Sequence, residues 1–391
     1  MPDSKIVPID NMPQVWLKVN TMKKNFARLL IGSGENSPEI RYLTGISTPD
    51  DFICLEYSGS VTALMSKLEI SRAKEYAKPG VSVLLETDYG STRLEIISRI
   101  SEVLKVNAFE VPPDFPLGIA DKLRAAGLEI TVSEAAFCPG RICKTPDEVR
   151  FITASQRAGE AGFARAVEVL KESAIGNDGG LLWQATPLTS EILRAEIDCT
   201  ILKHGALPTG TICAGAIQSA QPHNAGSGRL FAGTPIVMDI FPRNPETGYW
   251  GDLTRTVVKG KAPETVKKAY AAVKAARDTV KKNITVGADC AKLHLLAEKV
   301  LDRHRFYTGI SDGEPFGFFH GLGHGVGLEI HEVPRLSPRS CEKLKGGEVF
   351  TVEPGVYYRE WGGIRLEDLI YLAPDGTVNT LTSAPDFLEI D

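Results

Sequence analysis

The first third of the chain alternates apolar segments typical of strands with amphipathic segments typical of helices. The strand-like segments are residues 28–32, 51–57, 61–65, 81–85, 107–111 and 129–132. The helix-like segments are residues 68–77, 94–104 and 119–126. Strands that alternate with helices predict an α/β domain with a largely parallel sheet. One pair is expected to be antiparallel, because Tyr57-Ser-Gly-Ser60 has the composition of a hairpin turn.

A helix start signal at Thr145 marks the end of this pattern. Thr145 can cap the helix, Pro146 suits its first position, and Glu148 can complete a capping box. Apolar spacing extends this helix to about Glu172. We therefore predict two domains, residues 1–144 and residues 145–391.

The second domain has a different order of elements. Helical patterns are found at residues 189–205, 263–282 and 288–304, and strand-like runs lie between and after them. Strands grouped around helices predict an α+β domain with mostly antiparallel pairing.

Charge and composition exclude several classes of protein. The net charge of −5 gives no basic footprint for nucleic acid. No run of about eighteen apolar residues predicts a membrane span, and residues 1–8 lack the apolar core of a signal peptide. The seven cysteines include no C-x-x-C pair. They are expected to be small, buried or partly buried residues of a cytoplasmic protein.

Residues 320–332 are the most unusual segment of the second domain. They hold three histidines (His320, His324 and His331), two glutamates and four glycines. Glycines let the backbone approach a ligand closely and adopt positive φ. The segment is not a single-zinc protease motif, because Arg335 stands where H-E-x-x-H needs its second histidine. It also lacks the residues that follow a nucleotide-binding glycine loop.

Two pairs of carboxylates flank this segment in the sequence. Asp239 and Asp252 lie on strand-like segments joined by a predicted hairpin loop, and Glu353 and Glu367 lie on a second such pair. Each alone could be a surface residue or a strand end. Together with one imidazole, they could hold two divalent cations such as manganese, cobalt or zinc, since bridging carboxylates offset the repulsion between the metals.

The second domain resembles the pita-bread metallopeptidases, which include methionine aminopeptidase, aminopeptidase P and prolidase. The motifs that carry the resemblance are Gly248-Tyr-Trp-Gly-Asp-Leu-Thr-Arg-Thr256, residues 320–332, Thr351-Val-Glu-Pro-Gly-Val-Tyr357 and Gly363-Ile-Arg-Leu-Glu-Asp368. The first domain, with Ile40-Arg-Tyr-Leu-Thr-Gly45, is similar to the creatinase/prolidase N-terminal domain. Its presence favours the branch of the family that cleaves Xaa-Pro bonds.

The resemblance implies a set of metal ligands. Asp239 would chelate one metal, Asp252 and Glu367 would bridge both, and His324 and Glu353 would complete the other shell. A bridging hydroxide would be the nucleophile, because coordination lowers the pKa of water. Glu353 would then shuttle its proton to the leaving nitrogen.

The resemblance also implies roles around the metals. His223 and His331 would bind substrate and stabilise the oxyanion. Arg365 would orient a metal-binding carboxylate, and His320 would shape the pocket. Arg335, with Arg339 as an alternative, would hold the terminal carboxylate of a dipeptide.

The first aspartate departs from the family pattern. The family has Asp-x-Gly, whereas this chain has Asp239-Ile-Phe241, and the separation of thirteen positions between Asp239 and Asp252 exceeds the family's spacing. We read this as a longer hairpin loop that leaves the strand register open.

The sequence thus predicts a metal-dependent exopeptidase for proline-containing peptides, either an Xaa-Pro dipeptidase or an aminopeptidase P. A homodimer is expected by analogy. Two alternatives share the fold: a metal-free, creatinase-like C–N hydrolase and a peptide- or protein-binding module. Both should show broken metal ligands, and the five predicted ligands are all present.

Overall fold

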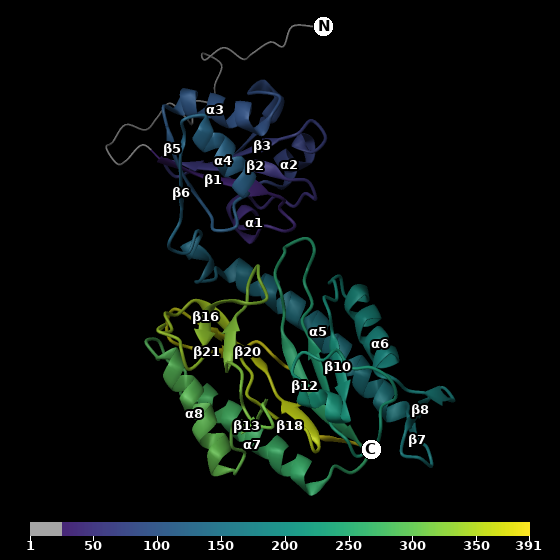
Figure 1. The fold of residues 1–391 in the computed structure, drawn as a ribbon. Helices are drawn as coiled ribbons and strands as arrows, with labels where there is room; N and C mark the ends of the chain where they lie inside the picture. The colour runs from purple at the N-terminus through teal and green to yellow at the C-terminus, as the bar shows by residue number, and fades with distance from the viewer. Residues whose placement is uncertain (1–25) are drawn as a thin grey trace. The chain divides into compact units, whose positions relative to one another are not determined.

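The computed structural model describes residues 26–391. Chain contacts divide it into two compact units between Pro139 and Gly140 (Figure 1). The predicted division at Lys144 stays a prediction, and the expectation for residues 1–8 lies outside the described residues.

The first unit is built on a six-stranded mixed sheet with strand order β4-β3-β2-β1-β5-β6. Its strands are β1 Phe26–Gly32, β2 Phe52–Tyr57, β3 Ser60–Met65, β4 Val81–Leu85, β5 Ala108–Val111 and β6 Glu129–Val132. Its helices are α1 Pro38–Thr44, α2 Ile70–Tyr76, α3 Arg93–Leu104 and α4 Leu117–Ala125. The α/β class is confirmed, and both faces of the sheet carry buried apolar clusters, with Leu29 in one and Leu30 in the other.

The expected antiparallel pair at the hairpin is confirmed, and the sheet has a second antiparallel pair that was not expected. β2 runs antiparallel to both β1 and β3, whereas β3–β4, β1–β5 and β5–β6 are parallel. The β2–β3 hairpin has the expected two-residue turn, with φ of 51° at Ser58 and 78° at Gly59. The second antiparallel pair arises because the short α1 turns the chain back beside β1 instead of carrying it across the sheet.

The second unit opens with the predicted capped helix. At the start of α5, Pro146–Glu172, the Thr145 side chain accepts a hydrogen bond from the backbone N–H of Glu148. The Glu148 side chain in turn accepts one from the backbone N–H of Thr145. α6, Ser190–Lys203, packs against α5 at Gly162, where a Cβ would lie only 3.0 Å from Ile197. The other long helices are α7 Glu264–Lys281 and α8 Cys290–Arg303.

Nearly all strand pairs of this unit are antiparallel. One sheet has the order β10-β11-β12-β22, with β10 Ile212–Gly215, β11 Ile236–Ile240, β12 Leu253–Lys259 and β22 Glu389–Ile390. A second has the order β16-β15-β17-β20-β21, with β15 Gly323–Gly325, β16 Glu332–Leu336, β17 Glu348–Val352, β20 Asp368–Leu372 and β21 Val378–Thr380. Two smaller sheets have two strands each, β18 Gly355–Tyr358 with β19 Gly362–Arg365 and β13 Gly309–Ser311 with β14 Glu314–Phe316. A third has the order β7-β8-β9, with β7 Ala174–Ile175, β8 Leu181–Trp183 and β9 Thr186–Pro187. Only β12–β22 is parallel, so the α+β class is confirmed.

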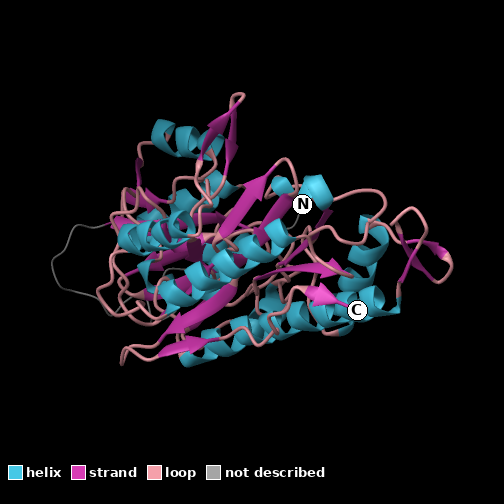
Figure 2. Cartoon of the chain, turned by 90° about the horizontal axis from the view of Figure 1, so that it is seen from below, coloured by secondary structure: helices cyan, strands magenta, loops and turns pink. Residues whose placement is uncertain are grey.

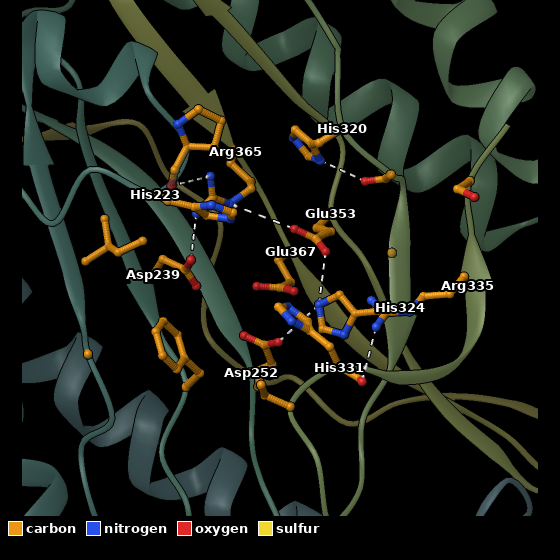
Figure 3. A pocket seen from close by; sticks show the side chains of 18 of the residues that line it. His223, Asp239, Asp252, His320, His324, His331, Arg335, Glu353, Arg365 and Glu367 are labelled. Carbon is orange, nitrogen blue, oxygen red and sulfur yellow. Dashed lines mark hydrogen bonds and ion pairs between the residues drawn. The ribbon is translucent and has the colours of Figure 1, made fainter. Parts of the chain in front are cut away.

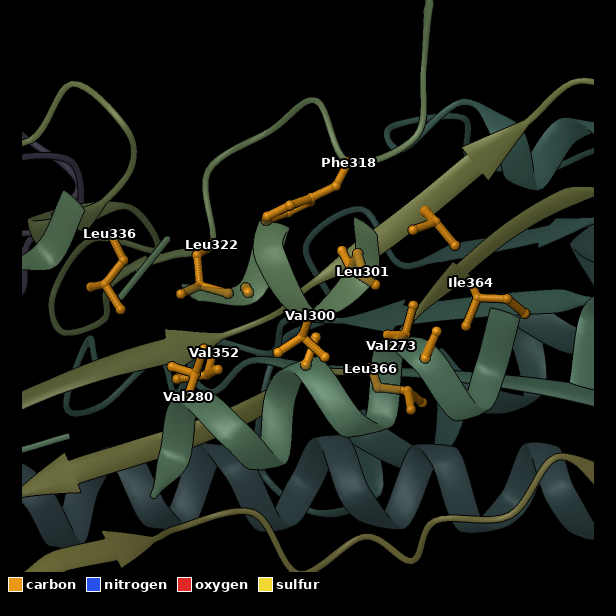
Figure 4. Close-up of a cluster of buried hydrophobic side chains, with 14 of the residues drawn as sticks. Val273, Val280, Val300, Leu301, Phe318, Leu322, Leu336, Val352, Ile364 and Leu366 are labelled. Atoms are coloured by element: carbon orange, nitrogen blue, oxygen red, sulfur yellow. The ribbon is translucent and has the colours of Figure 1, made fainter. Parts of the chain in front are cut away.

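The core of the second unit holds these layers in place. Val273 and Val280 of α7 and Val300 of α8 pack in one buried cluster with Val352 of β17 and Ile364 of β19 (Figure 4). Helices therefore support the strands that carry the site from behind. Figure 2 shows the mixture of helices and strands expected of α/β and α+β domains.

Two sequence expectations concern the chain as a whole. Among the described residues, no helix combines the length and the apolarity that crossing a membrane requires. The prediction that the cysteines are buried is wrong for three of them, because Cys143, Cys199 and Cys341 are exposed.

Candidate active site

The first pair of carboxylates lies on a single long hairpin. β11 pairs with β12 with Asp239 opposite Thr254, and the same register continues outward to Arg243 opposite Trp250. Asp252 comes two residues before Thr254, so both point to the same face as Asp239. The longer loop therefore extends the hairpin without shifting its register.

The second pair is arranged in the same way. β17 and β20 pair with Val352 opposite Asp368, and β18 and β19 pair with Gly355 opposite Arg365 in the same register. This register places Glu353 directly opposite Glu367 on one hairpin. Side chains directly opposite one another in an antiparallel pair are close enough to share a ligand.

The glycine-rich segment brings His324 between these hairpins. His324 lies in β15, which pairs with β16 and β17, and its backbone N–H donates to Thr351 Oγ1 over 3.1 Å. A Cβ at Gly323 would lie 2.0 Å from the carbonyl oxygen of Thr351, and one at Gly325 would lie 2.1 Å from that of Val333. The glycines are needed because the neighbouring strands approach so closely.

The hairpins and the glycine-rich segment enclose one cavity of about 730 Å³. Every residue predicted for the site lines it, and Figure 3 shows Asp239 and His223 on one side of the central carboxylates and Arg335 on the other. The predicted residues in this lining are His223, Asp239, Asp252, His320, His324, His331, Arg335, Glu353, Arg365 and Glu367. Arg339, the alternative to Arg335, is not among the lining residues.

The centre of the cavity has the donor set of a metal site. Asp252, His324 and Glu367 are buried, and each offers a ligand atom within 4.8 Å of the others. His324 Nε2 lies 3.2 Å from Glu353 Oε1 and 3.6 Å from Asp252 Oδ2. Burial and the neighbouring carboxylates raise the pKa values of Asp252 and Glu367 well above their ordinary range. Buried carboxylates so close together need cations to be ionised at the same time, and this donor set fits divalent metal ions.

Arg365 and Thr254 tie the carboxylates to one another. The buried Arg365 guanidinium donates to Asp239 Oδ2 over 2.7 Å through Nη2 and to Thr254 Oγ1 over 3.2 Å through Nε. Thr254 Oγ1 lies 3.0 Å from Asp239 Oδ1 and 2.9 Å from Glu367 Oε2. Thr254 was missed by the sequence analysis, although it stands in a quoted motif, because a threonine in a strand is unremarkable.

Tyr357 was also missed, and it determines which ring nitrogen of His320 carries the proton. Arg365 Nη1 donates to the Tyr357 hydroxyl over 2.8 Å, and that hydroxyl lies 3.0 Å from His320 Nε2. The tyrosine proton therefore points to Nε2, and His320 Nδ1–H donates to the carbonyl of Gly321 over 2.7 Å. Burial lowers the pKa of His320. Both ring nitrogens are used within the protein, which suits a residue that shapes the pocket.

The two histidines predicted to face substrate stand at the edge of the cavity. The His331 ring lies edge-on to that of His324, with centroids 4.3 Å apart. Desolvation, His324 and Arg335 together lower the pKa of His331 to about 4, so it is neutral near pH 7. His223 is exposed on the loop after the 3₁₀ helix Ala216–Ala220.

Comparisons with known proteins agree with this geometry. The sequence pattern of metallopeptidase family M24 matches residues 150–374. The Xaa-Pro dipeptidase of Pyrococcus horikoshii is 26% identical over 346 residues, which cover 87% of this chain and 89% of the relative.

Solved structures of similar proteins cover nearly the whole chain. The X-Pro aminopeptidase from Thermotoga maritima superposes with a TM-score of 0.79 at 24% identity, covering 93% of this chain and 97% of its own. The prolidase from Pyrococcus horikoshii superposes with a TM-score of 0.77 at 25% identity, covering 93% of this chain and 95% of its own. The predicted resemblance is confirmed, and the chain belongs to metallopeptidase family M24.

Proposed function

We propose that this chain is an exopeptidase that uses two divalent metals to hydrolyse Xaa-Pro bonds. The observation that carries the proposal is the convergence of all five predicted ligands, from two hairpins and the glycine-rich segment, on one cavity. Relatives named as an Xaa-Pro dipeptidase and an X-Pro aminopeptidase support the same substrate class.

Asp239, Asp252, His324, Glu353 and Glu367 would hold the metals, which when bound activate water and polarise the scissile carbonyl. Glu353 would be the group that accepts a proton. In the metal-free chain burial raises its pKa, but the hydrogen bond and charge of His324, with His320 and Arg365, outweigh burial and bring it to about 2. The carboxylate is therefore ionised at neutral pH and able to coordinate a cation.

The rim of the cavity would bind the peptide. His331 and His223 would donate to the oxyanion that develops at the carbonyl. Arg335 is exposed on the strand after His331, where its guanidinium could pair with the terminal carboxylate of a dipeptide. Arg365, which donates to Asp239, would keep that ligand oriented.

The proposal is tested by hydrolysis of Xaa-Pro and Xaa-Pro-Yaa peptides after EDTA treatment and after addition of Mn²⁺, Co²⁺ or Zn²⁺. We expect activity that EDTA removes and one of these metals restores. Absence of metal-restored activity on every proline peptide would favour the creatinase-like hydrolase or the binding module. The homodimer stays a prediction, which light scattering of the purified chain would check.

A further inference from the structure

A buried group of charges lies behind β16, the strand that follows His331. Lys144 Nζ lies 2.5 Å from Glu332 Oε1, and Arg141 Nη2 lies 2.8 Å from Glu332 Oε2. The side chains of Lys144, Glu332 and Arg141 are 1%, 7% and 10% exposed. Arg141 also reaches Glu329 over 2.6 Å. Both oxygens of Glu332 are thus paired with cations away from the proposed metal ligands.

The partners of Glu332 are fixed in turn by the backbone. Lys144 Nζ also donates to the carbonyls of Arg141 over 2.6 Å and Ile142 over 3.2 Å, so its three protons are all used. A Cβ at Gly327 would lie 2.4 Å from Glu332 Oε1. The glycine therefore makes room for the carboxylate between the His331 loop and residues 141–144.

The two faces of β16 separate this group from the cavity. Glu332, Pro334 and Leu336 are buried, whereas His331 and Arg335 are exposed and line the cavity. Successive side chains of a strand point to opposite faces. Glu332, the first residue of β16, is therefore held from the back of the strand, directly after His331 and on the strand whose front carries Arg335.

We propose that Glu332, clamped by Lys144 and Arg141, is a positioning residue that sets the placement of His331 and Arg335 in the cavity. The inference rests on the proposed function for its kinetic consequence, although the placement itself can be measured without activity. Groups that meet a transition state must be held closely, and a misplacement of about 1 Å can cost about a hundredfold in rate.

The test compares Glu332→Gln and Lys144→Met with the parent chain. Glutamine keeps the shape of Glu332 and removes its charge. We expect kcat/KM for an Xaa-Pro dipeptide to fall about tenfold or more in each variant, with unchanged manganese content. In a His331→Ala/Arg335→Ala background, adding Glu332→Gln should cause no further loss, because residues that act through one another are not additive.

A spectroscopic measurement separates positioning from stability. In protein labelled with ¹³C-histidine, the His331 ring signal should shift or broaden in Glu332→Gln. Asp178→Asn, which removes the exposed ion pair with Arg229, should change neither this signal nor kcat/KM.

Two results would overturn the proposal. One is a lower melting temperature in Glu332→Gln with kcat/KM and the His331 signal unchanged, which would make the group a stabilising element only. The other is a full additional loss in the His331→Ala/Arg335→Ala background. If the parent chain cleaves no proline peptide, the proposed function fails, and the His331 signal still decides whether Glu332 positions that ring.

Discussion

Replacing Thr254 by valine should weaken metal binding while leaving the shape of the site intact. Thr254 is fully buried on β12. Its hydroxyl lies within 3.0 Å of Asp239 Oδ1 and 2.9 Å of Glu367 Oε2 and accepts from Arg365 Nε over 3.2 Å. One hydroxyl thus connects two proposed ligands to the arginine that orients one of them. Valine has nearly the same volume and can make none of these bonds.

The size of the effect follows from the charges involved. The hydroxyl donates one proton, to a carboxylate, and a hydrogen bond to a charged group contributes about 1.5–3 kcal/mol. Residues that orient metal ligands typically contribute about 10–100-fold in affinity. Tenfold corresponds to about 1.4 kcal/mol, so the two estimates agree. We expect Thr254→Val to raise the Kd for Mn²⁺ by about 10–100-fold.

Thr256 provides a matched control on the same strand. It is also fully buried, and its hydroxyl donates to the carbonyl of Arg365 over 2.9 Å and accepts from the Arg365 backbone N–H over 3.0 Å. Thr256→Val therefore removes backbone bonds and no carboxylate contact. Isothermal titration with Mn²⁺ should show the loss only in Thr254→Val. Equal losses in the two variants, or no loss in Thr254→Val, would refute the reasoning.

Three further predictions concern the metal centre and the substrate. Asp252→Ala should reduce hydrolysis to background at every metal concentration, and full activity would refute its assignment as a bridge. Arg335→Ala should weaken kcat/KM about tenfold or more on Xaa-Pro dipeptides, with much smaller losses on longer Xaa-Pro peptides; equal losses on both would exclude a carboxylate contact. A hundredfold excess of Mn²⁺ over its Kd should stabilise the chain by about 2.7 kcal/mol. In the metal-free chain the pKa values of Asp252 and Glu367 are raised, so these two groups hold protons in the folded state that they have lost in the unfolded state, and their contribution to stability falls as pH rises above about 4. The gain in melting temperature on adding Mn²⁺ should therefore be larger at pH 8 than at pH 5.5, and the reverse order would contradict the raised pKa values.

The carboxylate hairpins could be predicted because their signals are local. Asp239 in an apolar strand is unusual, and a loop between two strand-like segments predicts that the strands pair. In the structure each hairpin keeps one register across the residues that carry its carboxylates, from Asp239 to Trp250 and from Val352 to Arg365. Because side chains alternate between the two faces of a strand, counting residues along each strand was enough to place the carboxylates on one face.

The first unit shows where local signals fail. α1, Pro38–Thr44, has seven residues and was not predicted. It is capped by Ser37 and ends at Gly45, which has a φ of 73°. Seven residues give only a weak helical period, and α1 was missed whereas the equally short α2 was predicted. The direction of β2 depends on this helix, so the missed helix and the unexpected second antiparallel pair have one cause.

Thr254, Tyr357 and Glu332 could not be assigned from the sequence for a different reason. Thr254 links Asp239, across its own hairpin, to Glu367, which lies more than a hundred residues away, as does Lys144 from Glu332. No nearby pattern indicates these distant partners. Glu332 follows His331 directly, yet its side chain is buried and paired with Lys144, whereas His331 is exposed and lines the cavity. In a site built from hairpins, the neighbour of a functional residue is therefore a candidate for holding the strand, and the residue two positions away is a candidate for sharing the site.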